Sequence, residues 1–397
     1  MISSINCFIS KIKVISCAFL SENSFVNALP FIRVRKIIFF SLTLLVCAGA
    51  GSARAQQDAA TAPRFRLAVF PIDNLSDTSV PAREIRQSLT RNVLRNGIQI
   101  VDDDSLEKVM ARNRIRYTGG LDAQTAKALK DEAGIDAVLI TSLELYQPGD
   151  PPKIALTARL VATDPLEVKW MESIGLAGDD APGILGLGLI ADPQQLQEKA
   201  LRQLATSLAV YFDKSRNKRQ AGGVAKTFQP KLYYASEGLD RARKSTIAVI
   251  PFLNQGRRYR AGEIALLHFL KQLVGIETVR VVEPGLVREK MLNNRIIMNE
   301  GVSYRDEDVI GIPLNVDYFL TGQLFEYQDY PGASVNPRVD FSAMLIETMK
   351  RKVVWASNSY NAGDDAVFFF DAGRVSTAGV LADKMTRAIA ARMFGVR

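Results

Sequence analysis

Cysteine and histidine are scarce in this 397-residue sequence, and their scarcity excludes several kinds of catalytic site. The three cysteines, Cys7, Cys17 and Cys47, lie near the N-terminus, and His268 is the only histidine. Zinc clusters, cysteine–histidine nucleophiles and histidine triads need more of these residues than the rest of the chain offers. His268 follows Ile264 by four positions in an apolar stretch, so we interpret it as a core residue. The sequence predicts no metal site.

Nucleotide-binding loops are also absent or poorly formed. The chain has no G-x-x-x-x-G-K followed by Ser or Thr. The stretch "GLGLIA" (186–191) matches G-x-G-x-x-A, but no clear strand precedes it and Asp192-Pro193 follows at once. The cluster Asp102-Asp103-Asp104 indicates the start of a helix rather than a metal site, and we expect Asp104 to cap that helix. We therefore predict no catalytic residue and no cofactor.

Positive charge is concentrated at the N-terminus. The whole chain has a net charge of +8, but residues 1–55 contain six basic residues and one acidic residue. The remaining sequence is nearly balanced, with 44 basic and 41 acidic residues, which does not favour nucleic acid as a partner. We interpret the basic run Lys214–Arg219 and the loop "GRRYR" (256–260) as solvent-exposed surface.

The first 55 residues have the pattern of an export signal. A basic start is followed by the apolar run Ile37–Gly51 and by Ala53-Arg54-Ala55 before Gln56. The apolar run is short for a membrane span, so we predict cleavage between Ala55 and Gln56. The residues before Val34 do not fit a signal peptide, and a true translation start at Val34 is the alternative.

Lipidation is the alternative to cleavage after Ala55. "Leu44-Leu45-Val46-Cys47" resembles a lipoprotein cleavage site with Cys47 as the modified residue, although Val46 departs from the small residue expected there. After cleavage at Ala55 the mature chain would contain no cysteine, so its fold would depend on its core without disulfides.

Two long parts of the chain repeat each other. "LAVFPIDN" (67–74) returns as "IAVIPFLN" (247–254), a shift of 180 positions that becomes 181 and then 185 further along. The last shift aligns the only two tryptophans, Trp170 and Trp355, and two "GDDA" stretches that follow them. The added residues fall in regions rich in Pro and Gly, where loops tolerate insertion. We infer a tandem duplication of one module of ordinary domain size. The proposed boundaries are 65–212 for the first module, 213–244 for a linker, and 245–395 for the second module.

The sequence of each module predicts a mixed α/β (α+β) fold, in which helices pack on a mixed β-sheet that contains an antiparallel meander. An apolar strand at the start is followed by a helix and a second short strand, parallel to the first. Two more helices precede three strands that form the meander, and a helix closes the module. "GDDA" at 178–181 and 363–366 lies between the last strand and this closing helix. Gly-Asp-Asp is typical of a turn, and cation binding is the alternative.

These motifs resemble a known group. "IAVIPFLN" (247–254) and "VDYFLTGQL" (316–324), with their counterparts in the first module, are similar to strands of the curli secretion-channel family (CsgG) and of the TolB amino-terminal domain. The resemblance covers most of both modules. It implies an exported envelope protein, often lipidated, that works by binding partners.

We therefore expect a non-enzymatic, partner-binding accessory of envelope assembly, secretion or transport. The expected location is the periplasm or the periplasmic face of the outer membrane, and the expected partners are envelope proteins. Two alternatives are an enzyme that acts on an envelope polymer through carboxylates, and a structural subunit of a homo-oligomeric ring. The apolar segments after "GDDA" are candidates for a partner interface, with core packing as the alternative reading. They contain Leu185, Leu187, Leu189, Phe368, Phe369 and Phe370.

Overall fold

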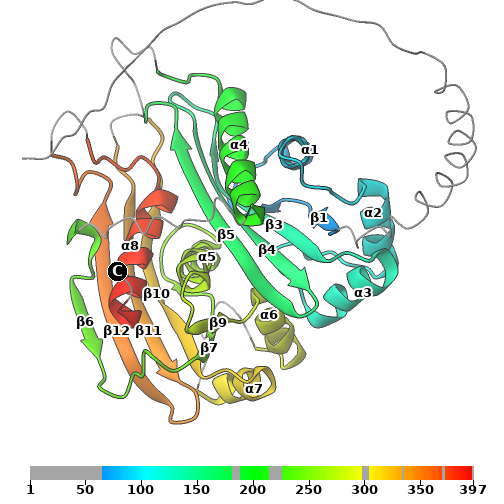
Figure 1. Cartoon of the computed structure of the whole chain (residues 1–397). Coiled ribbons are helices and arrows are strands. Elements are labelled where there is room, and N and C mark those ends of the chain that lie inside the picture. The colour runs from blue at the N-terminus through cyan, green and yellow to red at the C-terminus, as the bar shows by residue number, and fades with distance from the viewer. Residues whose placement is uncertain are drawn as a thin grey trace, which may run out of the picture. The chain divides into compact units, whose positions relative to one another are not determined.

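The computed structural model describes residues 65–180, 188–213, 226–296, 304–332, 335–368 and 372–395 (Figure 1). The first module contains β1 (Leu67–Val69), β2 (Asp73–Asn74), α1 (Ala82–Arg95), α2 (Asp103–Arg112), α3 (Ala123–Ala133), β3 (Ala137–Gln147), β4 (Lys153–Thr163), β5 (Leu166–Ala177) and α4 (Pro193–Phe212). The second contains β7 (Ser245–Val249), β8 (Leu253–Asn254), α5 (Ala261–Val274), β9 (Val279–Val281), α6 (Pro284–Asn293), α7 (Tyr304–Leu314), β10 (Tyr318–Gln328), β11 (Arg338–Glu347), β12 (Lys352–Ala362) and α8 (Ala378–Phe394). The predicted mixed fold with two modules is confirmed.

Each module has its own mixed sheet. In the first sheet β1 pairs in parallel with β3, and β3, β4 and β5 form an antiparallel meander. In the second sheet β7 pairs in parallel with β10 and with β9, and β10, β11 and β12 form the corresponding meander. The meander agrees with the sequence prediction in both modules, and so do the parallel strands β7 and β9 of the second module. In the first module the expected second strand is reduced to one parallel bridge between Leu67 and Ile100.

The two modules agree down to single hydrogen bonds. The pairing of β3 with β4 shifts between Leu143 and Leu145, and the pairing of β10 with β11 shifts at the equivalent residues, 181 positions later. The carboxylate of Asp136 accepts the backbone N–H of Arg66 at 2.8 Å, and Asp317 accepts that of Thr246 at 2.8 Å. Such agreement shows that these aligned residues of the two halves have the same structural role.

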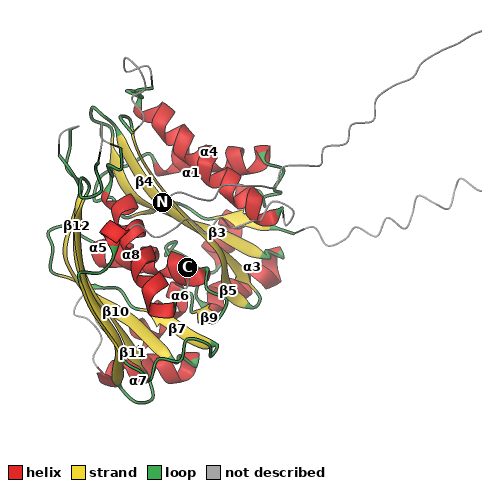
Figure 2. Cartoon of the chain, turned by 60° about the vertical axis from the view of Figure 1, so that its left-hand side comes forward, coloured by secondary structure: helices red, strands yellow, loops and turns green. Residues whose placement is uncertain are grey.

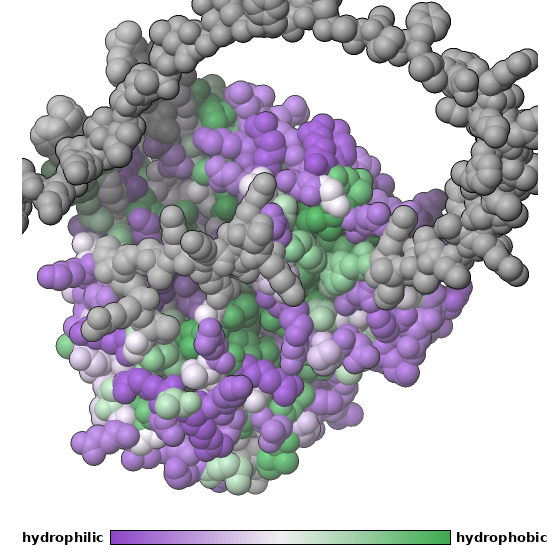
Figure 3. Space-filling model, viewed as in Figure 1, coloured by the Kyte–Doolittle hydropathy of each residue, from purple (hydrophilic) through white to green (hydrophobic). Residues whose placement is uncertain are grey.

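Helices α1 and α4 cover one face of the first sheet. Ile85 and Leu89 of α1 are buried there together with Leu204 of α4 and Trp170 of β5. Only five residues of α1 are buried, and hydrophilic side chains gather over the part of the surface where α1 and α4 lie (Figure 3). These two helices are amphipathic because sheet covers one side of them and solvent the other.

Helices α5 and α8 are covered on two sides. They share a core with Trp355 and the rest of the second sheet, and Met171 of β5 in the first sheet belongs to the same core. At Gly175 of β5, an added Cβ would lie 2.6 Å from both Thr377 Oγ1 and Val380 Cγ2 of the second module. The two helices therefore lie between the two sheets (Figure 2). Ten of the 14 residues of α5 are buried, as this double covering requires.

Two local expectations need correction. Part of the segment 213–244, expected to be a linker, forms a 3-10 turn (Lys226–Phe228) and the strand β6 (Leu232–Ala235), which pairs with the edge of β12. The N-cap of α2 is Asp102 rather than Asp104, because the Asp102 carboxylate accepts the Ser105 N–H at 2.8 Å. Residues Arg64–Arg397 form one compact unit.

Cys47, Ala55 and Gln56 lie outside the described residues, so cleavage and lipidation stay predictions. Among the helices that the structure describes, none is long and apolar enough to cross a membrane.

Candidate functional site

Charged residues of the first sheet meet charged residues of the second module in a buried layer. Arg159 of β4 donates through Nε and Nη2 to the two carboxylate oxygens of Glu283, at 3.2 and 3.0 Å. Their side chains are 1% and 0% exposed. Arg159 also donates to the carbonyl of Gly119 at 2.6 Å, and Glu283 accepts the N–H of Leu121 at 3.2 Å. This two-bonded geometry is the strongest form of such a pair, and it joins the start of α6 to the first module.

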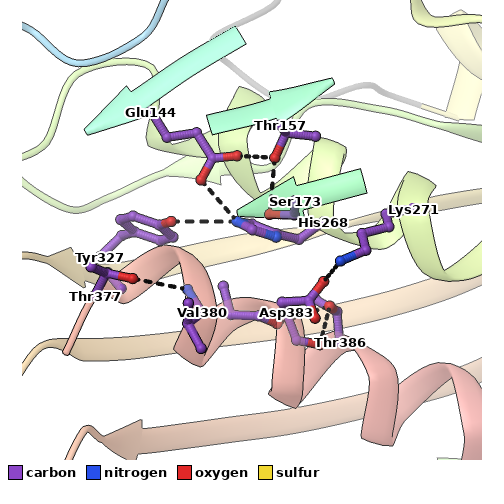
Figure 4. A network of polar contacts seen from close by, with 12 residues as sticks. Glu144, Thr157, Ser173, His268, Lys271, Tyr327, Thr377, Val380, Asp383 and Thr386 are labelled. Carbon is purple, nitrogen blue, oxygen red and sulfur yellow. Dashed lines mark hydrogen bonds and ion pairs between the residues drawn. The ribbon is translucent and has the colours of Figure 1, made fainter. Parts of the chain in front are cut away.

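A second buried pair connects β3 to α5 (Figure 4). His268 Nε2 lies 3.2 Å from Glu144 Oε2, and Thr157 donates its hydroxyl proton to the other carboxylate oxygen of Glu144. The hydroxyl of Tyr327 lies 3.5 Å from the same His268 nitrogen. Burial acts to raise the pKa of Glu144, but His268 and the hydrogen bonds to the carboxylate hold that pKa below its usual value. His268 is thus a buried residue, as interpreted from the sequence, and its partner belongs to the other module.

Lys271, one turn further along α5, lies between two carboxylates. Its Nζ is 3.1 Å from Glu172 of β5 and 2.8 Å from Asp383 of α8. Burial acts to lower the pKa of Lys271, but the two carboxylates raise it above its usual value. The pKa of Asp383 is lowered in turn, because the attraction of Lys271 outweighs the effect of burial. Lys271 and Asp383 are therefore charged at neutral pH, and their contacts with each other and with Glu172 hold β5, α5 and α8 together.

The loop 256–260 is also part of this contact, so its interpretation as exposed surface is wrong for Arg258 and Arg260, although Arg257 and Tyr259 are exposed. Arg258 lies 3.1 Å from Asp329 and donates to the backbone carbonyl of Glu144. Arg260 lies 3.3 Å from Asp73 of the first module. The side chains of the two arginines are only 11% and 23% exposed. In this contact the second module supplies the arginines and the first module supplies their acceptors, Asp73 and the Glu144 carbonyl. The first module therefore has no matching basic cluster.

A small cavity adjoins this layer. Asp73, Tyr117 and Ser142 from the first module line it together with Arg288 and other residues of the second, and its volume is about 30 Å³. That is room for one or two water molecules. Burial raises the pKa of Tyr117 to about 12, so the phenol stays neutral. Within the described ranges, no three or more His, Cys, Asp or Glu side chains gather to hold a metal ion.

The two "GDDA" stretches form the same turn. The carboxylate of Asp180 accepts the N–H of Ala177 at 2.7 Å, and that of Asp365 accepts the N–H of Ala362 at 3.1 Å. A Cβ added to the glycine of each turn would lie 2.1 and 2.3 Å from the backbone oxygens of Ile190 and Val375, which are equivalent residues. The glycines admit the chain that crosses beside them. The second aspartate of each stretch is thus engaged by the turn itself.

Two of the predicted interface residues lie in the described part of the chain. Leu189 is 54% exposed and Phe368 is 80% exposed, each in the connection between the meander and the closing helix of its module. Leu185, Leu187, Phe369 and Phe370 fall outside the described residues.

Comparison with known proteins gives similar structures but no family. No family model matches the chain, and no curated protein matches it. The PelC dodecamer of Paraburkholderia phytofirmans is 19% identical with a TM-score of 0.27, over 40% of this chain and 96% of that one. The LpoB C-terminal domain of Salmonella enterica is 20% identical with a TM-score of 0.25, over 30% and 86%. Lipoprotein GNA1162 of Neisseria meningitidis is 21% identical with a TM-score of 0.27, over 36% and 98%.

Proposed function

We propose that this protein is a non-enzymatic envelope protein, exported to the periplasm or the periplasmic face of the outer membrane, where it binds partner proteins in envelope assembly, secretion or transport. Export is supported by the leader pattern that ends at Ala55. We further propose that the chain arose by tandem duplication, with modules at 65–212 and 245–395. The matching hydrogen bonds and sheet irregularities of the two halves support this origin.

The buried layer between the modules carries the proposal of a binding protein. Glu283, Glu144 and Asp329 are the carboxylates most removed from solvent there, and each is paired with a cation or histidine of the contact. Groups engaged in this way hold two modules as one rigid body. A carboxylate enzyme for an envelope polymer would instead need acids that face a cleft wide enough for the polymer. The pairing of these acids with cations and a histidine favours the binding function.

The binding surface that we propose includes the apolar connections after the two meanders. Leu189 and Phe368 are exposed there, and large exposed apolar side chains are typical of partner contacts. Both residues follow a tight "GDDA" turn, so a well-ordered sheet end presents them.

Site-specific photocrosslinking in intact cells tests the function. A photoreactive residue replaces Phe368 or Leu189, and a matched control replaces Met349, an apolar residue that is 84% exposed in the turn between β11 and β12. We expect envelope proteins to be captured from positions 368 and 189 and not from 349. Export without capture from either position would overturn the proposal, as would hydrolysis of an envelope polymer by the purified protein that acidic-residue substitutions abolish.

A further inference from the structure

The face of the first sheet that α5 and α8 cover has a counterpart in the second sheet. In the first sheet Ser173 and Gly175 of β5 lie on the covered face, where Gly175 meets α8. The residues 185 positions later are Asn358 and Tyr360 of β12, and both are exposed, Tyr360 to 59%. None of the described helices covers this part of the second sheet (Figure 2). Along β11 and β12 the second sheet thus presents openly a face that the fold buries in the first, while α6 and α7 cover the part of that face formed by β7 and the start of β10.

The first module carries two exposed helices that could cover such a sheet face in the way that α5 and α8 cover the first sheet. Helices α1 and α4 correspond in the repeat to α5 and α8, and their outward sides are exposed. Arg83, Arg91 and Arg95 are exposed on α1 and Arg202 is exposed on α4. Arg91 takes the place of Lys271, the cation of α5 that faces the first module. Hydrophilic residues accordingly dominate this surface in Figure 3.

The open face of the second sheet has the opposite charge at its centre. Glu326 of β10 and Asp340 of β11 are paired directly across the two strands. Burial, and then the Glu326 carboxylate, raise the pKa of Asp340 above its usual value. Two carboxylates side by side attract a cation, and Tyr360, paired with Asp340 on the same face, already has the Lys231 ammonium 5.2 Å from the centre of its ring. A surface with two carboxylates at its centre is complementary in charge to the arginine-bearing helices α1 and α4.

We propose that a second copy of this chain places its α1 and α4 on the open face of the second sheet, so that the contact between the two modules is repeated between molecules. The proposal deepens the function proposed above, because it names one partner of the same rigid body. The contact is heterologous: each molecule uses one surface to receive and another to dock, so further copies can add.

This contact differs from the internal one in strength. Tyr360 stands where Gly175 admits α8 closely, so the docking helices lie further from the sheet. Polar residues of α1, such as Glu84 and Gln87, replace the apolar Ile264 and Leu267 of α5. Attraction between arginines and carboxylates therefore contributes most of the affinity, and we expect the association to be reversible and to weaken with salt.

Complementary charge reversals test the proposal with the processed protein purified from cells that express the full chain. One variant carries Glu326→Lys and Asp340→Lys, and the other carries Arg91→Glu and Arg202→Glu. In sedimentation velocity at low salt, we expect the unaltered protein to associate with increasing concentration and each variant alone to remain monomeric. A mixture of the two variants is expected to associate again, because the unaltered helices of one variant meet the unaltered face of the other and the two reversed surfaces are also opposite in charge.

Control and contrary outcomes are distinct. Lys108→Glu with Arg116→Glu reverses two exposed charges on another surface and should leave association unchanged. Unaltered protein that stays monomeric at every concentration would overturn the proposal, as would a basic-surface variant that still associates. Far-ultraviolet circular dichroism checks folding, and Glu326→Gln with Asp340→Asn replaces the first variant if it does not fold.

Crosslinking from position 360 separates a second copy from a foreign occupant. A photoreactive residue at Tyr360 should capture α1 and α4 peptides of this same chain. Capture of a different protein only would overturn the proposal and leave the partner-binding function standing. If position 360 captures this same chain but positions 189 and 368 capture no envelope protein, the association of copies would stand and the proposed binding of envelope partners would be overturned.

Discussion

Arg159 and Glu283, 124 residues apart in the sequence, form a fully buried ion pair with two hydrogen bonds. The pair connects the middle of the first meander to the start of α6 in the second module. Burying two charges costs free energy that only their mutual contact offsets, so the pair commits the modules to one arrangement.

Arg159→Met should destabilise the protein by about 3–5 kcal/mol, because it leaves the Glu283 carboxylate buried without a partner. Adding Glu283→Leu should recover part of that loss. Urea unfolding of both single variants and the double variant measures the coupling. Arg112→Ala, in an exposed pair with Glu132, serves as the control and should cost less than about 1 kcal/mol. Additive losses at Arg159 and Glu283 would contradict the coupling.

Gly175→Ala should cost about 1–3 kcal/mol, because the new Cβ would lie 2.6 Å from Thr377 Oγ1 and Val380 Cγ2 and force α8 away from β5. Gly149→Ala is the matched control, since a Cβ there has no atom within 4 Å. The control should change the free energy of unfolding by no more than about 0.5 kcal/mol. Equal effects of the two substitutions in thermal unfolding would show that α8 does not depend on the close approach at Gly175.

Acid should weaken the contact between the modules. The pKa values of Glu144 and Asp383 are lower in the folded protein than in the unfolded chain. Their contribution to stability is therefore complete above the ordinary carboxyl pKa of about 4 and is lost as the pH falls through the folded values. Urea unfolding at pH values from 7 to about 3 measures this loss. Asp383→Asn should flatten the dependence, and an unchanged pH profile in that variant would exclude Asp383 as its source.

The "GDDA" turns should be indifferent to calcium. Asp180 and Asp365 already accept backbone N–H groups, so we expect the melting temperature to stay the same when calcium is added. Asp365→Asn should destabilise the protein by about 1 kcal/mol, since a weaker acceptor replaces the carboxylate. Differential scanning calorimetry measures both effects. A rise in melting temperature with calcium that Asp365→Asn abolishes would establish a cation site instead.

The repeat, the strands and the turns could be predicted because short-range pattern determines them. "LAVFPIDN" and "IAVIPFLN" are apolar enough to be buried strands wherever the chain places them, and each "GDDA" closes a turn with atoms only three residues apart. The core position of His268 followed from its apolar helix in the same way. These features need no knowledge of the rest of the molecule.

Only the tertiary structure decided which sheet face is covered and by what. Arg159 and Met344 occupy equivalent positions 185 residues apart, on the corresponding face of each sheet. Arg159 is buried because Glu283, far away in the sequence, supplies a countercharge, whereas the side of the second sheet that carries Met344 is not covered by α5 or α8. Likewise Arg258 and Arg260 looked like surface residues until the first module provided their partners. A polar side chain carries no sign of its burial when the group that compensates its charge lies more than a hundred residues away.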